Sequence, residues 1–129
     1  MAHDDQISKG LQPSQQIVWV YTTDLDGTCD FYGRVLGLEL ARDAGNARIF
    51  KTTGQSAIGV CMAFEDRIVQ PTGSMITLVT EEVDAWHAIL EERGANLIGP
   101  PRRLDKFGIY GFFCRDPNGY VIEFQRFIE

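Results

Sequence analysis

The chain has 129 residues, enough for one globular domain of ordinary size and too few for two independent ones. Its 44% hydrophobic and 23% charged residues are typical of a soluble globular protein. Eighteen acidic residues against 12 basic ones give a net charge of −6, which argues against nucleic acid or an anionic membrane surface as a partner. No apolar run approaches the roughly 18 residues of a membrane span, so we expect no membrane insertion.

Two features suggest where the domain begins and where the protein resides. Residues 1–14 are polar and lack the apolar segment of a secretory signal, so we expect a flexible leader followed by a single domain over residues 15–129. The three cysteines, Cys29, Cys61 and Cys114, are odd in number and have no CxxC spacing. They are interpreted as reduced thiols, which predicts a cytoplasmic protein.

The first half of the domain, about residues 16–66, has the pattern of a strand, a helix and three further strands. β-branched and aromatic residues predict the first strand over 17–21. Asp24 or Asp26 can cap the following helix, and Gly37 can end it by adopting the left-handed backbone of a C-terminal cap. Further strands are predicted over 38–42, 47–52 and 57–64.

The same order repeats over about residues 73–128, after a joint at Pro71-Thr72-Gly73. A strand is predicted over 75–80, and a helix follows whose first turn is acidic, as the helix dipole favours. Gly94 ends that helix, and strands are predicted over 96–98, 108–115 and 120–127. Asp-Pro-Asn-Gly at 116–119 is a strong turn sequence between the last two strands. The chain therefore consists of two βαβββ modules.

Two stretches within this repeat carry a family resemblance. The first helix lies in DLDGTCDFYGRVLGLEL, and the last hairpin contains DPNGYVIEF. In this order and inside a duplicated pattern, they resemble the vicinal oxygen chelate superfamily of glyoxalases, bleomycin-resistance proteins and extradiol dioxygenases. The resemblance implies an α+β fold with two tandem βαβββ modules forming a curved mixed sheet, an open cup, and helices on the convex side. It also implies a homodimer, with the cup closed either within one chain or between two.

The metal ligands that the resemblance implies are mostly missing. Enzymes of the family hold a divalent metal with a His or Gln on the first strand, a His on the first strand of module two, and a Glu on the last strand. Those positions are Ile17, then Ser74 or Met75, and Glu123, so only the last has a suitable side chain. We therefore expect no metal site and no cofactor, with an unconventionally held divalent metal as the alternative.

Other chemistry of the family also lacks its residues. Phe113 and Leu104 occupy the positions of the Tyr and the His that extradiol cleavage uses, so that reaction is disfavoured. His87 lies within the second predicted helix and is expected to pack against the sheet. No cysteine has a histidine partner in sequence, which gives a cysteine nucleophile little support.

Strand alternation predicts which side chains line the cup. The predicted lining residues are Ile17, Trp19, Tyr21, Ser74, Ile76, Leu78, Phe113, Val121, Glu123 and Gln125, and Cys61 is a further candidate. Such a surface suits a flat or hydrophobic organic molecule. Glu123 either contacts the ligand or acts as a base, or else it is a relic neutralised by a neighbour. Arg102 and Arg103 lie in a loop predicted over 99–107, where they either recruit an anion at the mouth of the cup or remain in solvent.

Three functions follow from these observations. The favoured one is a metal-independent protein of the bleomycin-resistance type that binds a small apolar or cationic molecule. The second is an enzyme that uses Glu123, with a glyoxalase-like lyase or isomerase favoured over an extradiol dioxygenase. The third is an interaction module without a ligand.

Overall fold

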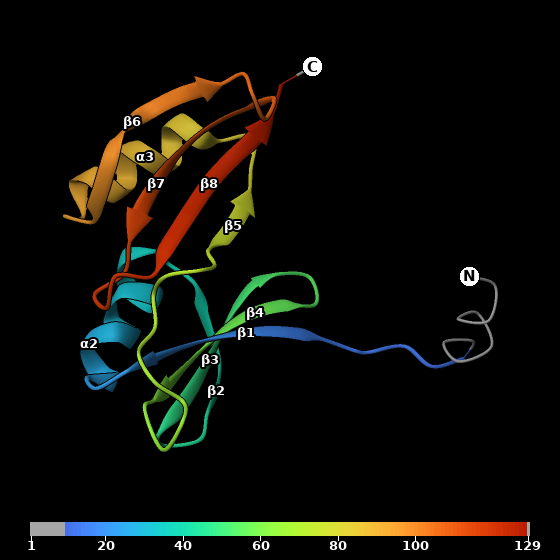
Figure 1. Cartoon of the computed structure of the whole chain (residues 1–129), viewed down its shortest axis with the longest axis vertical. Coiled ribbons are helices and arrows are strands. Elements are labelled where there is room, and N and C mark those ends of the chain that lie inside the picture. The colour runs from blue at the N-terminus through green and yellow to red at the C-terminus, as the bar shows by residue number, and fades with distance from the viewer. Residues whose placement is uncertain (1–9, 129) are drawn as a thin grey trace.

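The computed structural model describes residues 10–128, which form two four-stranded sheets and their covering helices (Figure 1). Module one contains β1 (Gln16–Thr22), α2 (Leu25–Asp30), the π-helical turn η1 (Phe31–Val35), β2 (Glu39–Asp43), β3 (Ala47–Thr53) and β4 (Ser56–Met62). Module two contains β5 (Ile76–Val79), α3 (Val83–Glu92), β6 (Asn96–Leu104), β7 (Ile109–Arg115) and β8 (Val121–Phe127). The α+β class and the two βαβββ modules are confirmed.

Both sheets have the same topology. Their strand orders are β1-β4-β3-β2 and β5-β8-β7-β6, and the first strand of each module pairs in parallel with the last one. All other pairings are antiparallel. The first strands β1 and β5 therefore each lie at a sheet edge. Of the leader expected over 1–14, residues 1–9 lie outside the described residues, and residues 10–15 are in neither helix nor strand.

The predicted helix of module one is present but changes its winding. Asp24 caps it, because its carboxylate accepts a hydrogen bond from the Gly27 amide at 3.1 Å. The helix then widens into η1, where the Leu36 amide donates to the Phe31 carbonyl. Gly37 follows with φ of +75°, the left-handed conformation expected of it.

The loop predicted over 99–107 is shorter than expected. Strand β6 continues through Leu104, with a bulge between Ile98 and Arg102 that absorbs Gly99-Pro100-Pro101. A bulge lets a strand continue past residues that cannot donate to the ladder. Arg102 and Arg103 therefore lie in β6, opposite Gly111 and Tyr110 of β7, and not in a loop.

Each sheet has an inner face that packs against the helices and an outer face that does not. Paired residues share a face, so Val20 and Val60 lie on the inner face of module one, and Ile122 and Phe124 lie on that of module two. These four residues belong to one buried cluster, together with residues of the helices. Both modules thus contribute to a single hydrophobic core.

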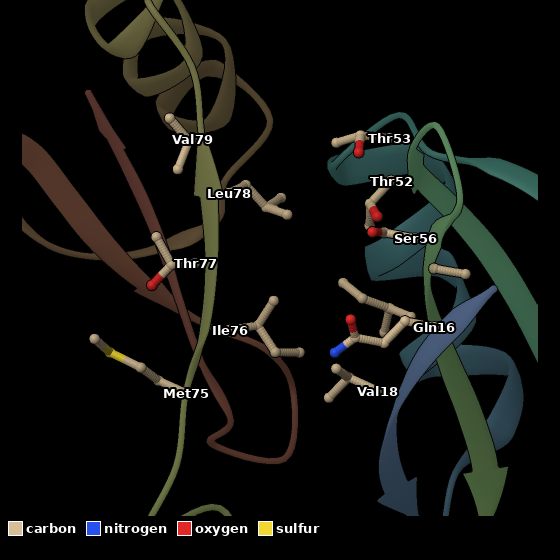
Figure 2. Close-up of a pocket in the computed structure, with 12 residues that line it drawn as sticks. Gln16, Val18, Thr52, Thr53, Ser56, Met75, Ile76, Thr77, Leu78 and Val79 are labelled. Atoms are coloured by element: carbon tan, nitrogen blue, oxygen red, sulfur yellow. The ribbon is translucent and has the colours of Figure 1, made fainter. Parts of the chain in front are cut away.

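Beyond the part that the helices cover, the inner faces of the two sheets are turned toward each other across a groove. Figure 2 shows Ile76 and Leu78 of β5 pointing across a gap toward Gln16 and Val18 of β1. Because the two inner faces are turned toward each other, the two outer faces point away from each other. The outer faces carry Trp19 in module one and Glu123 in module two.

At one end the modules are joined by buried and half-buried polar contacts. The Tyr32 hydroxyl donates to Asp116 at 2.7 Å, and the Asn118 amide donates to the Thr28 hydroxyl at 2.9 Å. The Thr22 hydroxyl in turn donates to the Asn118 side-chain oxygen at 3.2 Å. Arg93, just after α3, donates to the Val35 carbonyl at the end of η1. The contacts of Asp116 and Asn118 hold the turn between β7 and β8 against module one, and the Arg93 contact joins the end of α3 to η1.

Candidate functional site

The outer face of module two carries a buried carboxylate. Residue pairing places Phe113 of β7 and Thr77 of β5 on either side of Glu123. Glu123 is only 3% exposed although it lies on the face that the helices do not cover. Burial of a carboxylate is costly unless hydrogen bonds replace the water that it loses.

Two neighbours donate hydrogen bonds to Glu123. The Thr77 hydroxyl donates to its Oε1 at 2.8 Å. The Gln125 amide, oriented with its nitrogen toward the carboxylate, donates to both oxygens at 3.2 and 3.0 Å. A carboxylate offers about four lone-pair positions, so a further donor can still bind. The carboxylate is thus held in place and keeps acceptor capacity.

A hollow of about 320 Å³ opens over this carboxylate. We call it the Glu123 hollow, and its lining residues are Met75, Leu104, Phe107, Ile109, Phe113, Glu123, Gln125 and Phe127. All but Glu123 and Gln125 are apolar. Phe107 and Phe127 are 66% and 57% exposed, so the rim of the hollow presents aromatic surface to solvent. An apolar hollow with a few convergent polar groups is the usual form of a small-molecule site.

A second hollow of about 530 Å³ lies beside the first. We call it the Arg115 hollow, and its lining residues are Pro71, Thr72, Gly73, Ser74, Met75, Ile98, Phe113, Arg115 and Val121. Met75 and Phe113 line both hollows. The sequence-predicted residues Phe113, Glu123 and Gln125 thus come together in the Glu123 hollow, and Ser74 and Val121 adjoin them in the Arg115 hollow.

The expected residues of module one lie on a different surface. Ile17, Trp19 and Tyr21 share the outer face of module one with Gly59 and Cys61, their neighbours in β4. A Cβ atom at Gly59 would lie 2.4 Å from ring carbons of Trp19, so the indole ring lies directly against the glycine. None of the three lines either hollow of module two. Within one chain, these residues and Glu123 do not form a common cavity.

The assignment of β5 side chains to the cup has to be corrected. Ile76 and Leu78 pair with Ile122 and Phe124 and pack against the core, so they lie on the inner face, opposite to Glu123. Figure 2 shows Thr77 and Met75 on the other side of the strand. Ile76 and Leu78 instead line the groove between the modules, which measures about 510 Å³. No side chain that titrates lines this groove among the described residues, whereas the Glu123 hollow has a carboxylate.

The donor set does not fit the divalent metal of the family enzymes. Ile17 is apolar and lies on the outer face of the other module. In the part of the chain that the structure describes, the neighbours of Glu123 are the Thr77 hydroxyl, the Gln125 amide and the Met75 thioether, with no imidazole or second carboxylate. Within residues 10–128, no three His, Cys, Asp or Glu side chains are grouped to hold a metal. His87 packs edge-on against Phe112 at 4.9 Å, on the inner face.

Arg102 and Arg103 of β6 do not lie together at the opening of a cavity. Arg102 pairs with Gly111, which in turn pairs with Gln125, so Arg102 belongs to the outer face. Arg103 is directed to its neighbour Asp105, with an N–O distance of 3.0 Å. Neither lines the Glu123 hollow.

Comparison with known proteins agrees with the fold. The family model "Glyoxalase/Bleomycin resistance protein/Dioxygenase superfamily" matches residues 14–124. The chain belongs to this superfamily. No curated protein sequence resembles the chain closely enough to count as a match.

Several solved structures of the superfamily share the fold. A glyoxalase/bleomycin resistance protein/dioxygenase from Nocardioides has a TM-score of 0.74 at 17% identity, covering 100% of this chain and 95% of its own. TioX from Micromonospora sp. ML1 has a TM-score of 0.71 at 22% identity, covering 90% and 100%. Lactoylglutathione lyase from Agrobacterium tumefaciens has 0.70 at 24% identity, covering 89% and 95%. At these identities the likeness establishes the fold alone.

Several residues of the Glu123 hollow were missed by sequence reasoning. They are Thr77, Met75, Leu104, Phe107, Ile109 and Phe127. Thr77 is the one polar residue in the strand sequence Ile-Thr-Leu-Val, and this pattern could have predicted which face of the sheet it lies on. A polar residue between apolar ones in a strand is expected on the face away from the core. Thr77 lies on that face, next to Glu123.

Proposed function

We propose that the protein is a small-molecule binding protein of the bleomycin-resistance type, which takes an apolar or cationic organic ligand into the Glu123 hollow. The observation that carries the proposal is the Glu123 carboxylate, 3% exposed and oriented by Thr77 and Gln125 beneath apolar walls. A ligand donor that meets this carboxylate makes a charge-assisted hydrogen bond, which is stronger than a neutral one. The aromatic rim supplies the apolar contact.

A thermal-shift screen of aromatic amines and neutral aromatic compounds tests this proposal, because a ligand that binds only the native state raises its stability. Glu123→Gln should weaken amine binding by about 1.5–3 kcal/mol, the usual contribution of a hydrogen bond to a charged group. Glu91→Gln, an exposed position in α3, is the matched control and should leave binding unchanged. Equal affinity of the wild type and Glu123→Gln for every hit would contradict the proposal.

The alternative is an enzyme, a lyase or isomerase in which Glu123 moves a proton. The same orientation by Thr77 and Gln125 favours it, since a general base must be held at a fixed position. Turnover of a bound compound that is lost in Glu123→Gln while its affinity is retained would establish this function. Binding without turnover in the wild type would favour the binding protein. Because the described donor set around Glu123 does not fit a divalent metal, we propose both functions without one.

We further propose that a second copy of the chain completes the cup. The two outer faces point away from each other, so Trp19 of one subunit can cover Glu123 only in the other. Exposed apolar side chains on these faces support the pairing, with Trp19 38%, Met75 51% and Phe127 57% exposed. Light scattering should then give twice the chain mass of 14.5 kDa. Trp19→Glu should yield monomers, whereas Ile89→Glu, on the exposed side of α3, should not.

The proposed compartment is the cytoplasm. Cys29, Cys61 and Cys114 are all free, as expected where thiols stay reduced. Among residues 10–128, no helix has the length and apolar character needed to cross a membrane.

A further inference from the structure

The two hollows on the outer face of module two together form one elongated surface. Met75 and Phe113 line both of them, so the hollows meet at these two side chains. The shared region is apolar, a thioether and a phenyl ring. A ligand that lies over it can therefore reach both ends of the surface at once.

The two ends carry opposite charges. The Glu123 hollow has the buried carboxylate at its floor, and the Arg115 hollow has the Arg115 guanidinium in its wall. Among the described residues, Arg115 donates a single hydrogen bond, which is long at 3.4 Å, to the Gly119 carbonyl. None of the ion pairs among residues 10–128 includes Arg115. Most of its five N–H donors are thus available to an anionic group.

The strand pairing sets the separation of the two backbone positions. Phe113 lies directly opposite Glu123, and Arg115 lies two residues further along β7 on the same face. Two residues of a strand span about 7 Å. Phe113 is a neighbour of both residues on this face, and Met75 also lines both hollows.

We propose that the ligand is a zwitterion, with an ammonium group at Glu123, a carboxylate at Arg115 and an apolar middle of roughly one aromatic ring over Met75 and Phe113. The inference rests on the proposed binding function and specifies its ligand class. A guanidinium binds a carboxylate through two parallel hydrogen bonds, which gives this end geometric selectivity. The net charge of −6 disfavours a simple anion, whereas a zwitterion has no net charge to be repelled.

Three probes that share one ring test the proposal: 4-(aminomethyl)benzoate, benzylamine and benzoate. Calorimetric titration of the wild type should give an affinity for the zwitterion roughly tenfold or more above that of either single-charge probe. Arg115→Gln should lower the zwitterion's affinity to that of benzylamine and leave benzylamine itself unchanged. Glu123→Gln should lower it to that of benzoate.

Matched variants separate a charge effect from a folding defect. Arg115→Lys keeps the charge and should retain a large part of the zwitterion's advantage. Arg103→Gln removes an arginine that already has Asp105 as a partner, and it should change none of the three affinities. Circular dichroism and melting temperature establish that each variant is folded.

The two proposals fail in different ways. If benzylamine binds in a Glu123-dependent manner but the zwitterion binds no tighter, or Arg115→Gln has no effect, the zwitterion inference is overturned and the binding function stands. If none of the three probes binds, the zwitterion inference is overturned, and if Glu123→Gln also changes the affinity of no hit in the thermal-shift screen, the binding function is overturned with it.

Discussion

The hydroxyl of Tyr32 donates a 2.7 Å hydrogen bond to Oδ2 of Asp116, and this contact joins the helix of module one to the β7–β8 turn of module two. Both side chains are buried, at 0% and 4% exposure. The other oxygen of Asp116 accepts from the backbone amides of Asn118 and Tyr120, at 2.8 and 2.9 Å. Asp116 thus shapes its own turn and at the same time fixes that turn to the other module.

Tyr32→Phe should lower the free energy of unfolding by about 1–3 kcal/mol, because it leaves a buried carboxylate oxygen without its donor. Urea denaturation measures the change. Tyr110→Phe is the matched control, since Tyr110 also donates to a carboxylate, that of Asp84, but at the surface. Its cost should stay within about 0.5 kcal/mol. An equal loss of unfolding free energy in the two variants would contradict a larger contribution from the buried hydrogen bond.

Asp116 should also give the protein a specific pH dependence. Burial raises the pKa of its carboxyl above the usual 3.8, despite the opposing hydrogen bonds from Tyr32 and the turn backbone. Burial and the nearby Asp116 raise the pKa of Tyr32 as well, so its hydroxyl keeps the proton that it donates. The folded state therefore binds the Asp116 proton more tightly than the unfolded state does.

The sign of the effect follows from that difference. The contribution of Asp116 to stability is fully present below pH 3.8 and is lost as the pH rises through the raised pKa of the folded state. Because other acids titrate in the same range, the measurement is the difference in unfolding free energy between wild type and Asp116→Asn across pH 3–7. The wild type should lose stability relative to Asp116→Asn as the pH rises. A flat or opposite trend would contradict the raised pKa.

Much of the fold was predictable because local signals were strong. The Asp24 cap, the left-handed Gly37 and the Asp-Pro-Asn-Gly turn each act within a few residues, and each appears where the sequence predicts it. The outer-face placement of Glu123 and Gln125 followed from simple alternation on β8. The bulge in β6 was not predictable, because Gly99-Pro100-Pro101 has the composition of a loop.

The relative placement of the modules could not be read from the sequence. It depends on contacts such as Thr22 with Asn118 and Tyr32 with Asp116, between residues 96 and 84 positions apart. For the same reason the sequence alone could not separate Trp19 from Glu123. Strand alternation correctly places each residue on the face of its own sheet that is turned away from the core. Only the packing of the two inner faces against each other puts these outer faces on opposite sides of the molecule.

Thiol labelling should distinguish the three cysteines. Burial raises the pKa of Cys114 to about 12 and also raises that of Cys29, so both resist thiolate chemistry in the folded protein. Cys61 is half-buried on the outer face of module one, beside Tyr21. A disulfide reagent at pH 8 should therefore modify one thiol quickly and the other two only as the protein unfolds.

Cys61→Ser is the decisive variant for that experiment. It should abolish the fast phase, whereas Cys29→Ser should leave it unchanged, and all three thiols of the wild type should react in denaturant. A fast phase that survives in Cys61→Ser would mean that one of the buried thiols is accessible. The fast phase should also slow at protein concentrations that favour dimers, if a second copy covers the Trp19 face.

Gly59→Ala should displace Trp19. A Cβ at position 59 would lie 2.4 Å from two ring carbons, far inside van der Waals contact, so the indole has to move. Overpacking of this kind costs about 1–3 kcal/mol, although alanine is otherwise favoured over glycine inside a strand by roughly 0.5–1 kcal/mol. Thermal denaturation and the emission maximum of Trp19, recorded in a Trp86→Phe background, measure both effects.

A double-mutant cycle with Trp19→Ala separates the clash from any backbone effect. Once the indole is removed, Gly59→Ala should cost nothing and can become stabilising, because the strand propensity of alanine is then unopposed. A cost that persists without the indole would place the strain in the β4 backbone. Since Trp19 is the side chain proposed to cover Glu123 in a second copy, Gly59→Ala should also weaken dimer formation while leaving the Glu123 hollow of each subunit intact.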